Sequence, residues 1–282
     1  MSLPAWGVRT QVMGVLNLTP DSFSDGGCFS AAPAALRQAL KLQAQGADLL
    51  DLGAQSTRPG AVEVGAEVEL QRLMPSLTLI RQAMAGPDAP RLSIDTFHAA
   101  VAEAALEAGA DWINDVSGGR RDPAMLPLVA AAGCSYVLMH SRGDSRSMEA
   151  LATYDAVVPV VREELLRATE RALAAGVQAD QILWDPGLGF AKTTLQNLEL
   201  LRGLPQLKAE GFPLLLGASR KRFIGEVLQE PRPRARLWGT AAVCVAAIAA
   251  GVDVLRVHDV GPIVQTARMA DALYRPDQPL AV

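Results

Sequence analysis

Cysteine is scarce in this sequence, and the few cysteines lie far apart. Three occur in 282 residues, Cys28, Cys134 and Cys244, and none forms a C-x-x-C pair. This spacing argues against both a disulfide framework and a cysteine-ligated zinc site. The first ten residues, MSLPAWGVRT, lack the basic segment and the apolar run of a signal peptide. We therefore expect reduced thiols in a cytoplasmic protein.

Long apolar runs and an excess of basic charge are also missing. The most apolar stretch, residues 241–252, is interrupted by Asp253, and it is shorter than the roughly 20 apolar residues of a membrane span. The net charge is -4, and no cluster of Lys and Arg stands out. We therefore expect neither a membrane nor a nucleic acid as partner, and any bound anion must be held by a few local residues.

Apolar residues are abundant, and they recur in a repeated pattern. Half of the residues are hydrophobic and a fifth are charged, enough for a large core, and no low-complexity linker divides residues 1–282, so we predict a single domain. Four segments share a glycine that can end a helix, then a short apolar run, then a polar cluster. They are QGADLLDLGAQS (45–56), AGADWINDVSGG (108–119), AAGCSYVLMHSRG (131–143) and AGVDVLRVHDVG (250–261), and four looser matches are VMGVLN (12–17), RLSIDT (91–96), QILWDPG (181–187) and FPLLLGAS (212–219).

Amphipathic segments separate these eight candidate strands. We predict helices at residues 34–45, 67–84, 99–108, 123–132, 154–175, 194–209, 235–250 and 262–274. Strands that alternate with helices form a parallel sheet, and eight such units close naturally into a (β/α)8 TIM barrel of about 250 residues. The alternative is an open doubly wound sheet, but no G-x-G-x-x-G follows the first strand to support its dinucleotide-binding version.

Polar side chains follow the apolar run of nearly every predicted strand. In a barrel these positions meet at the carboxyl-terminal face, where such proteins carry their chemistry. A single Asp after a strand is most often a turn or helix-cap residue, and we interpret Asp115 and Asp259 in this way. The whole set is Asn17, residues 56–58, Asp95, residues 114–115, His140, Asp185, residues 219–221, Arg256 and His258.

Two carboxylates and one amide from this set can converge on a small ligand. Asp95, Asp185 and Asn114 would have only a ligand or Lys221 to neutralise them. Carboxylates accept paired N–H donors well, so a heterocycle with a guanidine-like edge would suit them. A Mg²⁺ ion is the competing ligand, because oxygen atoms of this kind also suit that metal.

The basic residues of the set indicate an anion site. Ser219 is expected to cap the helix after the seventh strand, with Lys221 beside it, and Arg256 and His258 end the eighth strand. The loops after strands seven and eight of such barrels often bind phosphate with the help of a helix N-terminus. Arg58, in an STRPG loop, could close on the same anion.

Several of these motifs together resemble one family. MGVLNLTPDSFSDGG, STRPG, SIDT, WINDVSGG, DPGLGF, SRK and RVHDV occur over nearly the whole chain, in the order seen in dihydropteroate synthases, the folate-pathway enzymes that sulfonamides inhibit. The resemblance implies a homodimeric (β/α)8 barrel. It also implies a transferase that joins 6-hydroxymethyl-7,8-dihydropterin pyrophosphate to p-aminobenzoate, releasing pyrophosphate and forming 7,8-dihydropteroate with Mg²⁺ as cofactor.

The resemblance also assigns roles to residues of this sequence. Asp95, Asp185 and Lys221 would be catalytic and, with Asn114, would bind the pterin. Asn17 would bind both pyrophosphate and Mg²⁺. The pyrophosphate would further meet Thr57, Arg58, Arg256 and His258, and the p-aminobenzoate would meet Thr57, Pro59, Phe190, Lys221 and Arg222.

Two loops are implied to be mobile covers of the site. Residues 17–29 and 54–64 would close over the substrates, with Phe23 as an apolar cover, and so keep water from the pterin cation that forms when pyrophosphate leaves. The carboxylates would stabilise that cation, and Mg²⁺, Arg256 and His258 would take up the charge on the leaving group.

The sequence departs from the family pattern at a few positions. Ala54 and Gln55 replace glycine and glutamate before STRPG, Arg222 replaces serine in SRKS, and GLGF-Ala191 replaces GFGF-Gly. Arg222 could pair with the substrate carboxylate or point to solvent. Two alternatives stay open: a non-catalytic paralogue that binds pterin, and a corrinoid-linked pterin-dependent methyltransferase, which would have no use for the SRK and RVHD motifs.

Overall fold

A computed structural model describes residues 6–19, 27–56 and 60–275, with residues 27–31 described by their backbone alone. Eight parallel strands form one sheet in the order β6-β5-β4-β3-β2-β1-β8-β7, and a parallel bridge between Trp184 and Leu214 joins its two edges. The predicted (β/α)8 barrel is confirmed. The strands are β1 (Gln11–Asn17), β2 (Leu49–Gly53), β3 (Arg91–Asp95), β4 (Trp112–Asp115), β5 (Ser135–Met139), β6 (Ile182–Asp185), β7 (Leu215–Leu216) and β8 (Val254–Val257).

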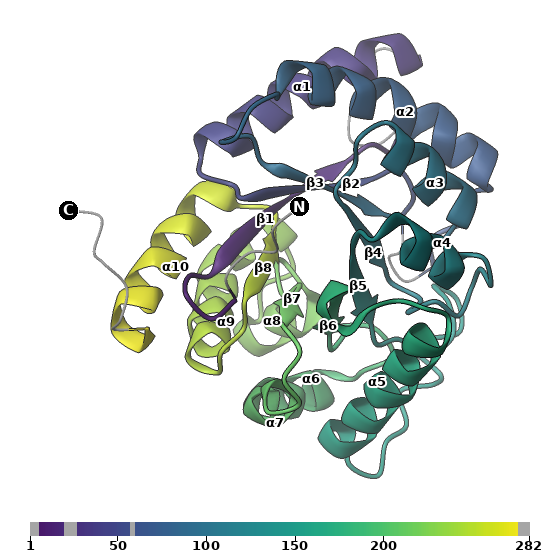
Figure 1. The fold of residues 1–282 in the computed structure, drawn as a ribbon. Helices are drawn as coiled ribbons and strands as arrows, with labels where there is room; N and C mark the ends of the chain where they lie inside the picture. Colours follow the sequence, from purple (N-terminus) through teal and green to yellow (C-terminus); the bar gives the residue numbers. More distant parts are fainter. Residues whose placement is uncertain (1–5, 20–26, 57–59, 276–282) are drawn as a thin grey trace.

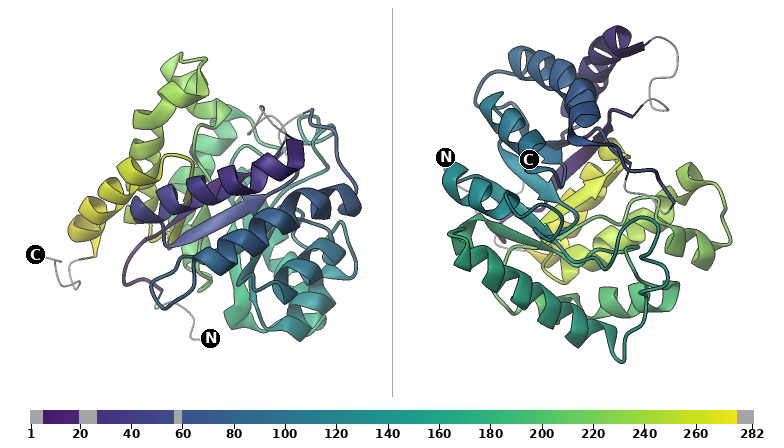
Figure 2. Two further views of the ribbon diagram at one scale, coloured as in Figure 1. Left: turned by 90° about the horizontal axis from the view of Figure 1, so that it is seen from above. Right: turned by 90° about the vertical axis from the view of Figure 1, so that its right-hand side faces the viewer.

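Helices surround the sheet on its outer side (Figure 1). Neighbours along the chain lie side by side in this ring, as α1 and α2 do in Figure 2. The α-helices are α1 (Gly27–Ala44), α2 (Ala66–Ala83), α3 (Ala99–Glu107), α4 (Met125–Ala132), α5 (Val157–Ala174), α6 (Thr194–Arg202), α7 (Leu204–Lys208), α8 (Arg222–Leu228), α9 (Leu237–Ala249) and α10 (Val260–Tyr274). None of the helices in the described ranges combines the length and the apolar character needed to cross a bilayer.

The glycine of the repeated sequence pattern has the expected role. Gly46, Gly109, Gly133 and Gly251 all have positive φ, between 63° and 94°. Each lies directly after a helix and before a strand, where a left-handed residue lets the chain turn back towards the sheet.

Two predictions about helices are wrong. The single helix expected at 194–209 is interrupted at Gly203, and the Pro205 that follows lies in the first turn of α7, where its missing N–H costs nothing. The helix α8 was missed, because seven residues are too few to show a helical period. Its N-cap is Lys221 without a side-chain hydrogen bond, so Ser219 does not cap it.

The core has one layer inside the barrel and another between the sheet and the helices. The inner layer is a plug of Met13, Leu49, Trp112, Val137, Leu183, Leu215 and Val254, closed by an edge-to-face contact of Trp6 with Trp112. Each of these side chains stabilises the fold by roughly 2 kcal/mol through burial. Side chains two residues apart on a strand share a face, so the next inward positions on β2, β4, β6 and β8 are Asp51, Asn114, Asp185 and Arg256. The polar site therefore lies directly on the apolar plug.

Candidate active site

The two carboxylates that we predict to bind the pterin lie at the carboxyl ends of barrel strands. Asp95 ends β3 and Asp185 ends β6, and their exposed fractions are 9% and 5%. Burial raises the pKa of both carboxyls above the ordinary value. For Asp95 the nearby Arg256 opposes the shift, and for Asp185 the backbone N–H of Gly187 does so, with Lys221 and Arg256 after it. Two buried carboxyl groups at the same end of the barrel can accept paired N–H donors.

Arg256 links several of the inward side chains. Its Nε donates to Asp51 Oδ2, and one of its Nη atoms donates to Asp95 Oδ2. Each of these donor–acceptor distances is 2.6 Å. Burial works against its charge, but Asp51 and Asp95 outweigh burial and raise the pKa of Arg256. Asp51 also accepts from Ser93 Oγ at 2.6 Å and from Asn114 Nδ2 at 3.3 Å. The predicted residues Asp95, Asn114 and Arg256 are thus members of one hydrogen-bonded network.

Asp51 is the residue of this network that sequence reasoning missed. It stands within the apolar run LLDLG of β2 and is fully buried. A carboxylate in the middle of a buried strand must be paired, and that was the available signal. Asp51 lies two residues after Leu49, which points into the barrel, so the alternation of side chains along a strand would have placed Asp51 beside the predicted site.

Lys221 lies against Phe190 beside Asp185. Its Nζ is 4.4 Å from the centre of the Phe190 ring, a cation–π contact. Burial lowers the pKa of Lys221 to about 8, and the charge of Asp185 opposes this shift most strongly. Asp185 Oδ1 accepts from the N–H of Gly187 at 2.8 Å. The structure thus brings Lys221 together with Asp185 and with Phe190, which the resemblance assigned to different substrates.

The residues expected at the pyrophosphate are only partly within the described ranges. Asn17 ends β1 and is half-buried. His258 Nδ1 is 3.0 Å from Ser219 Oγ, and the His258 N–H donates to the same oxygen. Thr57, Arg58 and Pro59 lie outside the described residues, as do residues 20–26 with Phe23. The closure of the loops at 17–29 and 54–64 therefore stays a prediction.

Two residues that depart from the family pattern, Gln55 and Arg222, have clear hydrogen-bond or ion-pair partners. Gln55 is buried, and its Oε1 accepts from the N–H of Val64, so it braces the loop after β2 from within. The Arg222 side chain is 66% exposed and pairs with Glu149 at 2.7 Å and Glu226 at 3.3 Å. Arg222 therefore points towards the segment after β5.

The two aspartates interpreted as turn or cap residues differ. Asp115 holds a turn, because its carboxylate accepts from the N–H groups of Ser117 and Gly119. Asp259 occupies the N-cap position of α10 but makes no side-chain cap bond, and it pairs with Arg220 at 2.6 Å.

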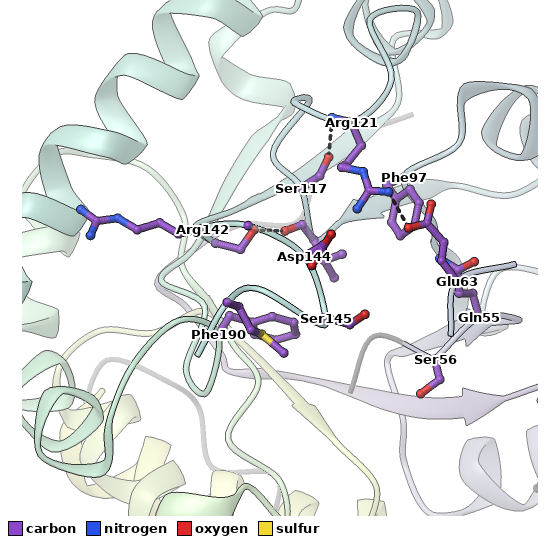
Figure 3. Close-up of a pocket in the computed structure, with 14 residues that line it drawn as sticks. Gln55, Ser56, Glu63, Phe97, Ser117, Arg121, Arg142, Asp144, Ser145 and Phe190 are labelled. Atoms are coloured by element: carbon purple, nitrogen blue, oxygen red, sulfur yellow. Dashed lines mark hydrogen bonds and ion pairs between the residues drawn. The ribbon is translucent and has the colours of Figure 1, made fainter. Parts of the chain in front are cut away.

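A shallow hollow, open to solvent, is lined by Phe190 together with residues of the loops after β2, β3, β4 and β5. Phe190 forms one side of it, and Phe97 and Arg121 form the opposite side (Figure 3). The loop after β2 is fixed along its rim by two hydrogen bonds of 2.8 Å, from the Gly60 N–H to Ser145 O and from Ser145 Oγ to Ala61 O. This hollow shares Phe190 with the group formed by Lys221 and Asp185.

The described part of the chain contains no group of three or more His, Cys, Asp or Glu side chains arranged to hold a metal ion. The donor expected for Mg²⁺ is the amide oxygen of Asn17. A single protein oxygen fits Mg²⁺, because this ion usually keeps several waters and takes its remaining ligands from substrate phosphates.

Comparison with known proteins agrees with this geometry. The family model described as pterin binding enzyme matches residues 13–258. The chain belongs to the pterin-binding enzyme family. A curated dihydropteroate synthase from Synechocystis sp. is 48% identical over 96% of this chain and 92% of the relative.

Solved structures of this family are similar over their full length. A dihydropteroate synthase from Clostridium difficile, determined in the presence of pteroic acid, has a TM-score of 0.90 at 41% identity and covers 97% of this chain and all of its own. The enzyme of Xanthomonas albilineans in complex with 7,8-dihydropteroate has a TM-score of 0.85 at 39% identity and covers 97% of this chain and 96% of its own. The resemblance drawn from the motifs is confirmed, and the chain is placed among the transferases of folate synthesis.

Proposed function

We propose that this protein is a dihydropteroate synthase that joins 6-hydroxymethyl-7,8-dihydropterin pyrophosphate to p-aminobenzoate. The observation that carries the proposal is the pair of buried carboxylates, Asp95 and Asp185, set on an apolar plug beside two half-buried cations, Lys221 and Arg256. The amino-oxo edge of a pterin offers N–H donors for such carboxylates, and Asn114 can complete the recognition with its amide.

The same residues suit the charge that develops in the reaction. When pyrophosphate leaves the pterin methylene carbon, positive charge spreads into the pterin, and Asp95 and Asp185 stabilise it at short range. Lys221 and Arg256 offset the carboxylates before substrate arrives. Two donor positions of Arg256 are held by Asp51 and Asp95, so its other Nη meets the pyrophosphate together with His258. The arylamine nitrogen then attacks the methylene carbon, and no protein nucleophile is needed.

Asn17 would hold a Mg²⁺ ion that enters with the pyrophosphate. The ion, when bound, neutralises charge on the leaving group. Arg58 and Thr57 would add contacts to the same pyrophosphate.

The p-aminobenzoate would lie on Phe190, near Lys221, and the resemblance adds Thr57 and Pro59 as contacts. Arg222 would reach the substrate carboxylate only by leaving Glu149 and Glu226. Both pairs are largely exposed to solvent, so this exchange costs little.

The deciding experiment measures pyrophosphate release by purified protein with dihydropterin pyrophosphate and Mg²⁺, with and without p-aminobenzoate. Release that depends on p-aminobenzoate, with dihydropteroate as product, establishes the synthase. Pterin binding without turnover would favour a non-catalytic paralogue. Methyl transfer from a methylated pterin to a corrinoid protein would favour the methyltransferase.

We further propose that the protein is a cytoplasmic homodimer. Exposed apolar side chains occur on three neighbouring helices, α8, α9 and α10, where Val227, Leu228, Trp238, Met269, Leu273 and Tyr274 are 49% to 78% exposed. Large exposed apolar side chains such as Trp238 are typical of interfaces between subunits. Light scattering on the wild type and on Trp238→Glu tests the dimer. We expect a dimeric wild type and a monomeric variant, and a monomeric wild type would contradict the proposal.

The buried free thiols Cys134 and Cys244 support a reducing location in the cell, which cell fractionation tests.

A further inference from the structure

A second set of ionisable side chains, two of them buried, lies next to the site, and the reaction described above does not use it. His140 follows β5, Lys192 follows the loop after β6, and Glu164 lies on α5. His140 and Lys192 are only 4% and 6% exposed. His140 Nε2 is 2.7 Å from Glu164 Oε2, and His140 Nδ1 is 2.9 Å from Lys192 Nζ. We call these three residues the Lys192 chain.

The hydrogen bonds of the Lys192 chain suit a protonated Lys192 beside a neutral imidazole, while burial lowers the pKa of Lys192 to about 7. Lys192 Nζ also donates to Gly187 O at 3.0 Å and to Phe190 O at 2.9 Å, so its three donors have three acceptors. His140 Nδ1 must then accept, and its Nε2–H donates to Glu164. Burial lowers the pKa of His140 to about 4, which favours the neutral ring that this arrangement needs. The hydrogen bond from His140 lowers the pKa of Glu164 to about 2, so Glu164, at the far end of the Lys192 chain, stays negatively charged.

The turn held by Lys192 is unusual in its backbone. Gly187, Gly189 and Ala191 all have positive φ, at 67°, 78° and 48°, and the left-handed conformation is unfavourable for the alanine. A Cβ atom on Gly187 would lie 1.9 Å from His140 O, so the turn presses closely on the residue that orients Lys192. Such a conformation persists only where surrounding contacts enforce it, and the ammonium of Lys192 supplies contacts at both ends of the turn.

Each end of this turn contacts one of the pterin-binding groups. At one end, the N–H of Gly187 donates to Asp185 Oδ1, while Lys192 holds the carbonyl of the same residue. At the other end, Lys192 holds the carbonyl of Phe190, whose ring carries the ammonium of Lys221. Asp185 is left with its Oδ2 for a ligand, and Lys221 is kept beside it. One buried ammonium therefore fixes both members of the Asp185–Lys221 pair without facing the substrate itself.

We propose that Lys192, oriented by His140, is a positioning residue that sets the Asp185 carboxylate and the Lys221 ammonium for the pterin. This inference rests on the proposed function, because it assumes that these two groups bind the pterin. A merely structural role for Lys192 would affect the stability of the barrel and leave the affinity for the pterin unchanged. The two roles are separated by comparing binding with unfolding in the same variants.

The first test replaces the ammonium and uses an equivalent change elsewhere as control. In Lys192→Met, the Kd of 6-hydroxymethyl-7,8-dihydropterin pyrophosphate, measured by calorimetry, should rise at least tenfold. Lys208→Met removes a lysine that pairs with the buried Asp253 at the opposite end of the barrel, and it should lower the unfolding midpoint without changing that Kd. A wild-type Kd in folded Lys192→Met would overturn the proposal.

The second test changes only the acceptor that orients Lys192. His140→Asn places an amide oxygen near the position of Nδ1 and keeps an acceptor for Lys192, whereas His140→Gln places an amide nitrogen near Nε2 and keeps only the contact with Glu164. We expect His140→Asn to retain the wild-type Kd within about threefold, and His140→Gln to weaken binding as Lys192→Met does. Equal effects of the two variants would show that the ring serves packing alone and would contradict the proposal.

These measurements separate this inference from the proposed function. A wild-type protein that does not bind the pterin pyrophosphate refutes the proposed function before any variant is compared. A wild type that binds it, beside a folded Lys192→Met that binds it equally well, refutes only the positioning role.

Discussion

Buried carboxylates lie at both ends of the barrel, but their partners differ. At the amino-terminal end, Asp253 accepts from the N–H groups of Gly7 and Leu214 and from Lys208 Nζ. At the same end, Asp271 accepts from both the N–H and the hydroxyl of Thr10. These carboxylates hold the segments that enter the strands, and their oxygens are taken up by the protein itself.

At the carboxyl-terminal end, Asp95 and Asp185 have fewer partners. Asp185 receives one backbone N–H on Oδ1, and Asp95 receives Arg256 on Oδ2, whereas Asp51 and Asp115 at the same end each accept from three donors. Both Asp95 and Asp185 have a raised pKa because burial is only partly offset. We infer that Asp253 and Asp271 hold the fold together, whereas Asp95 and Asp185 are the carboxylates available to a ligand.

The largest effect is expected when a carboxylate at the carboxyl-terminal end is removed, which tests whether the two ends of the barrel differ in ligand binding. Asp185→Ala should weaken binding of the pterin pyrophosphate at least about a hundredfold, because it deletes charged hydrogen bonds worth roughly 3 kcal/mol in total. Lys221→Ala should do the same, since it removes the largest of the cationic side-chain influences on Asp185. Calorimetry gives the Kd and thermal unfolding gives the stability, which should fall little. Normal pterin affinity in both variants would refute the site assignment.

The corresponding change at the amino-terminal end should have the opposite result. Asp253→Asn should lower the free energy of unfolding by about 3 kcal/mol, because Lys208 and two backbone N–H groups lose a buried charge. Urea denaturation measures this change. The Kd for the pterin pyrophosphate should stay at its wild-type value, and a large rise in that Kd would show that the two ends are not independent.

Glu69 provides a pH-dependent test close to the carboxyl-terminal end. It is buried in the first turn of α2, its Oε2 has no hydrogen-bond partner, and burial raises its pKa to about 7. A group with a raised pKa in the folded state contributes stability that is complete below its ordinary pKa, near 4.5, and is lost as the pH rises through about 7.

The neutral variant Glu69→Gln cannot titrate at this position. Relative to the wild type, it should therefore gain on the order of 2 kcal/mol in unfolding free energy between pH 5 and pH 8. Urea denaturation at both values measures this difference. Groups far from Glu69 cancel because both proteins contain them, whereas His98, whose Nε2 is 3.9 Å from Glu69 Oε2, and Asp95 interact with the charge that is removed. A constant difference between the two proteins would mean that Glu69 is charged in the fold throughout.

The smallest effect is expected on the exposed rim. Arg222→Ser should change the KM for p-aminobenzoate by no more than about fivefold and leave pterin affinity unchanged, because exposed ion pairs contribute less than about 1 kcal/mol. Glu149→Gln is the matching control, since it releases Arg222 without removing it. If Arg222 reaches the substrate carboxylate, Glu149→Gln lowers this KM and Arg222→Ser raises it. A large loss of pterin affinity in either variant would contradict the proposed geometry.

The barrel could be predicted from the sequence because its evidence is local. Each strand is a short apolar run and each helix an amphipathic segment, and glycines such as Gly133 mark the turns between them. The same locality explains two errors, since α8 is too short to show a period and Pro205 interrupts a longer pattern. Asp95, Asn114, Asp185 and Arg256 could be proposed together because they lie at or next to the carboxyl ends of strands of one parallel sheet.

Pairing between side chains was not predictable in this way. Asp51 looks like part of an apolar run, and only the register of β2 between β1 and β3 brings it to Arg256, which lies 205 residues away in the sequence. Ser219 was expected to cap a helix, but the start of α8 at Arg222 leaves its hydroxyl to His258. Arg222 itself turned towards Glu149, a residue of another loop.

The sequence by itself determined the succession of strands and helices, the end of the barrel that carries the polar residues, and the family. These follow from spacing along the chain, which fixes the side chain's face and the strand's length. Only the tertiary structure decided which charges meet, as in the Asp51–Arg256 pair and the Lys192 chain. The physical reason is that burial and pairing depend on atoms brought together by closure of the barrel, and no local pattern in the sequence records those distances.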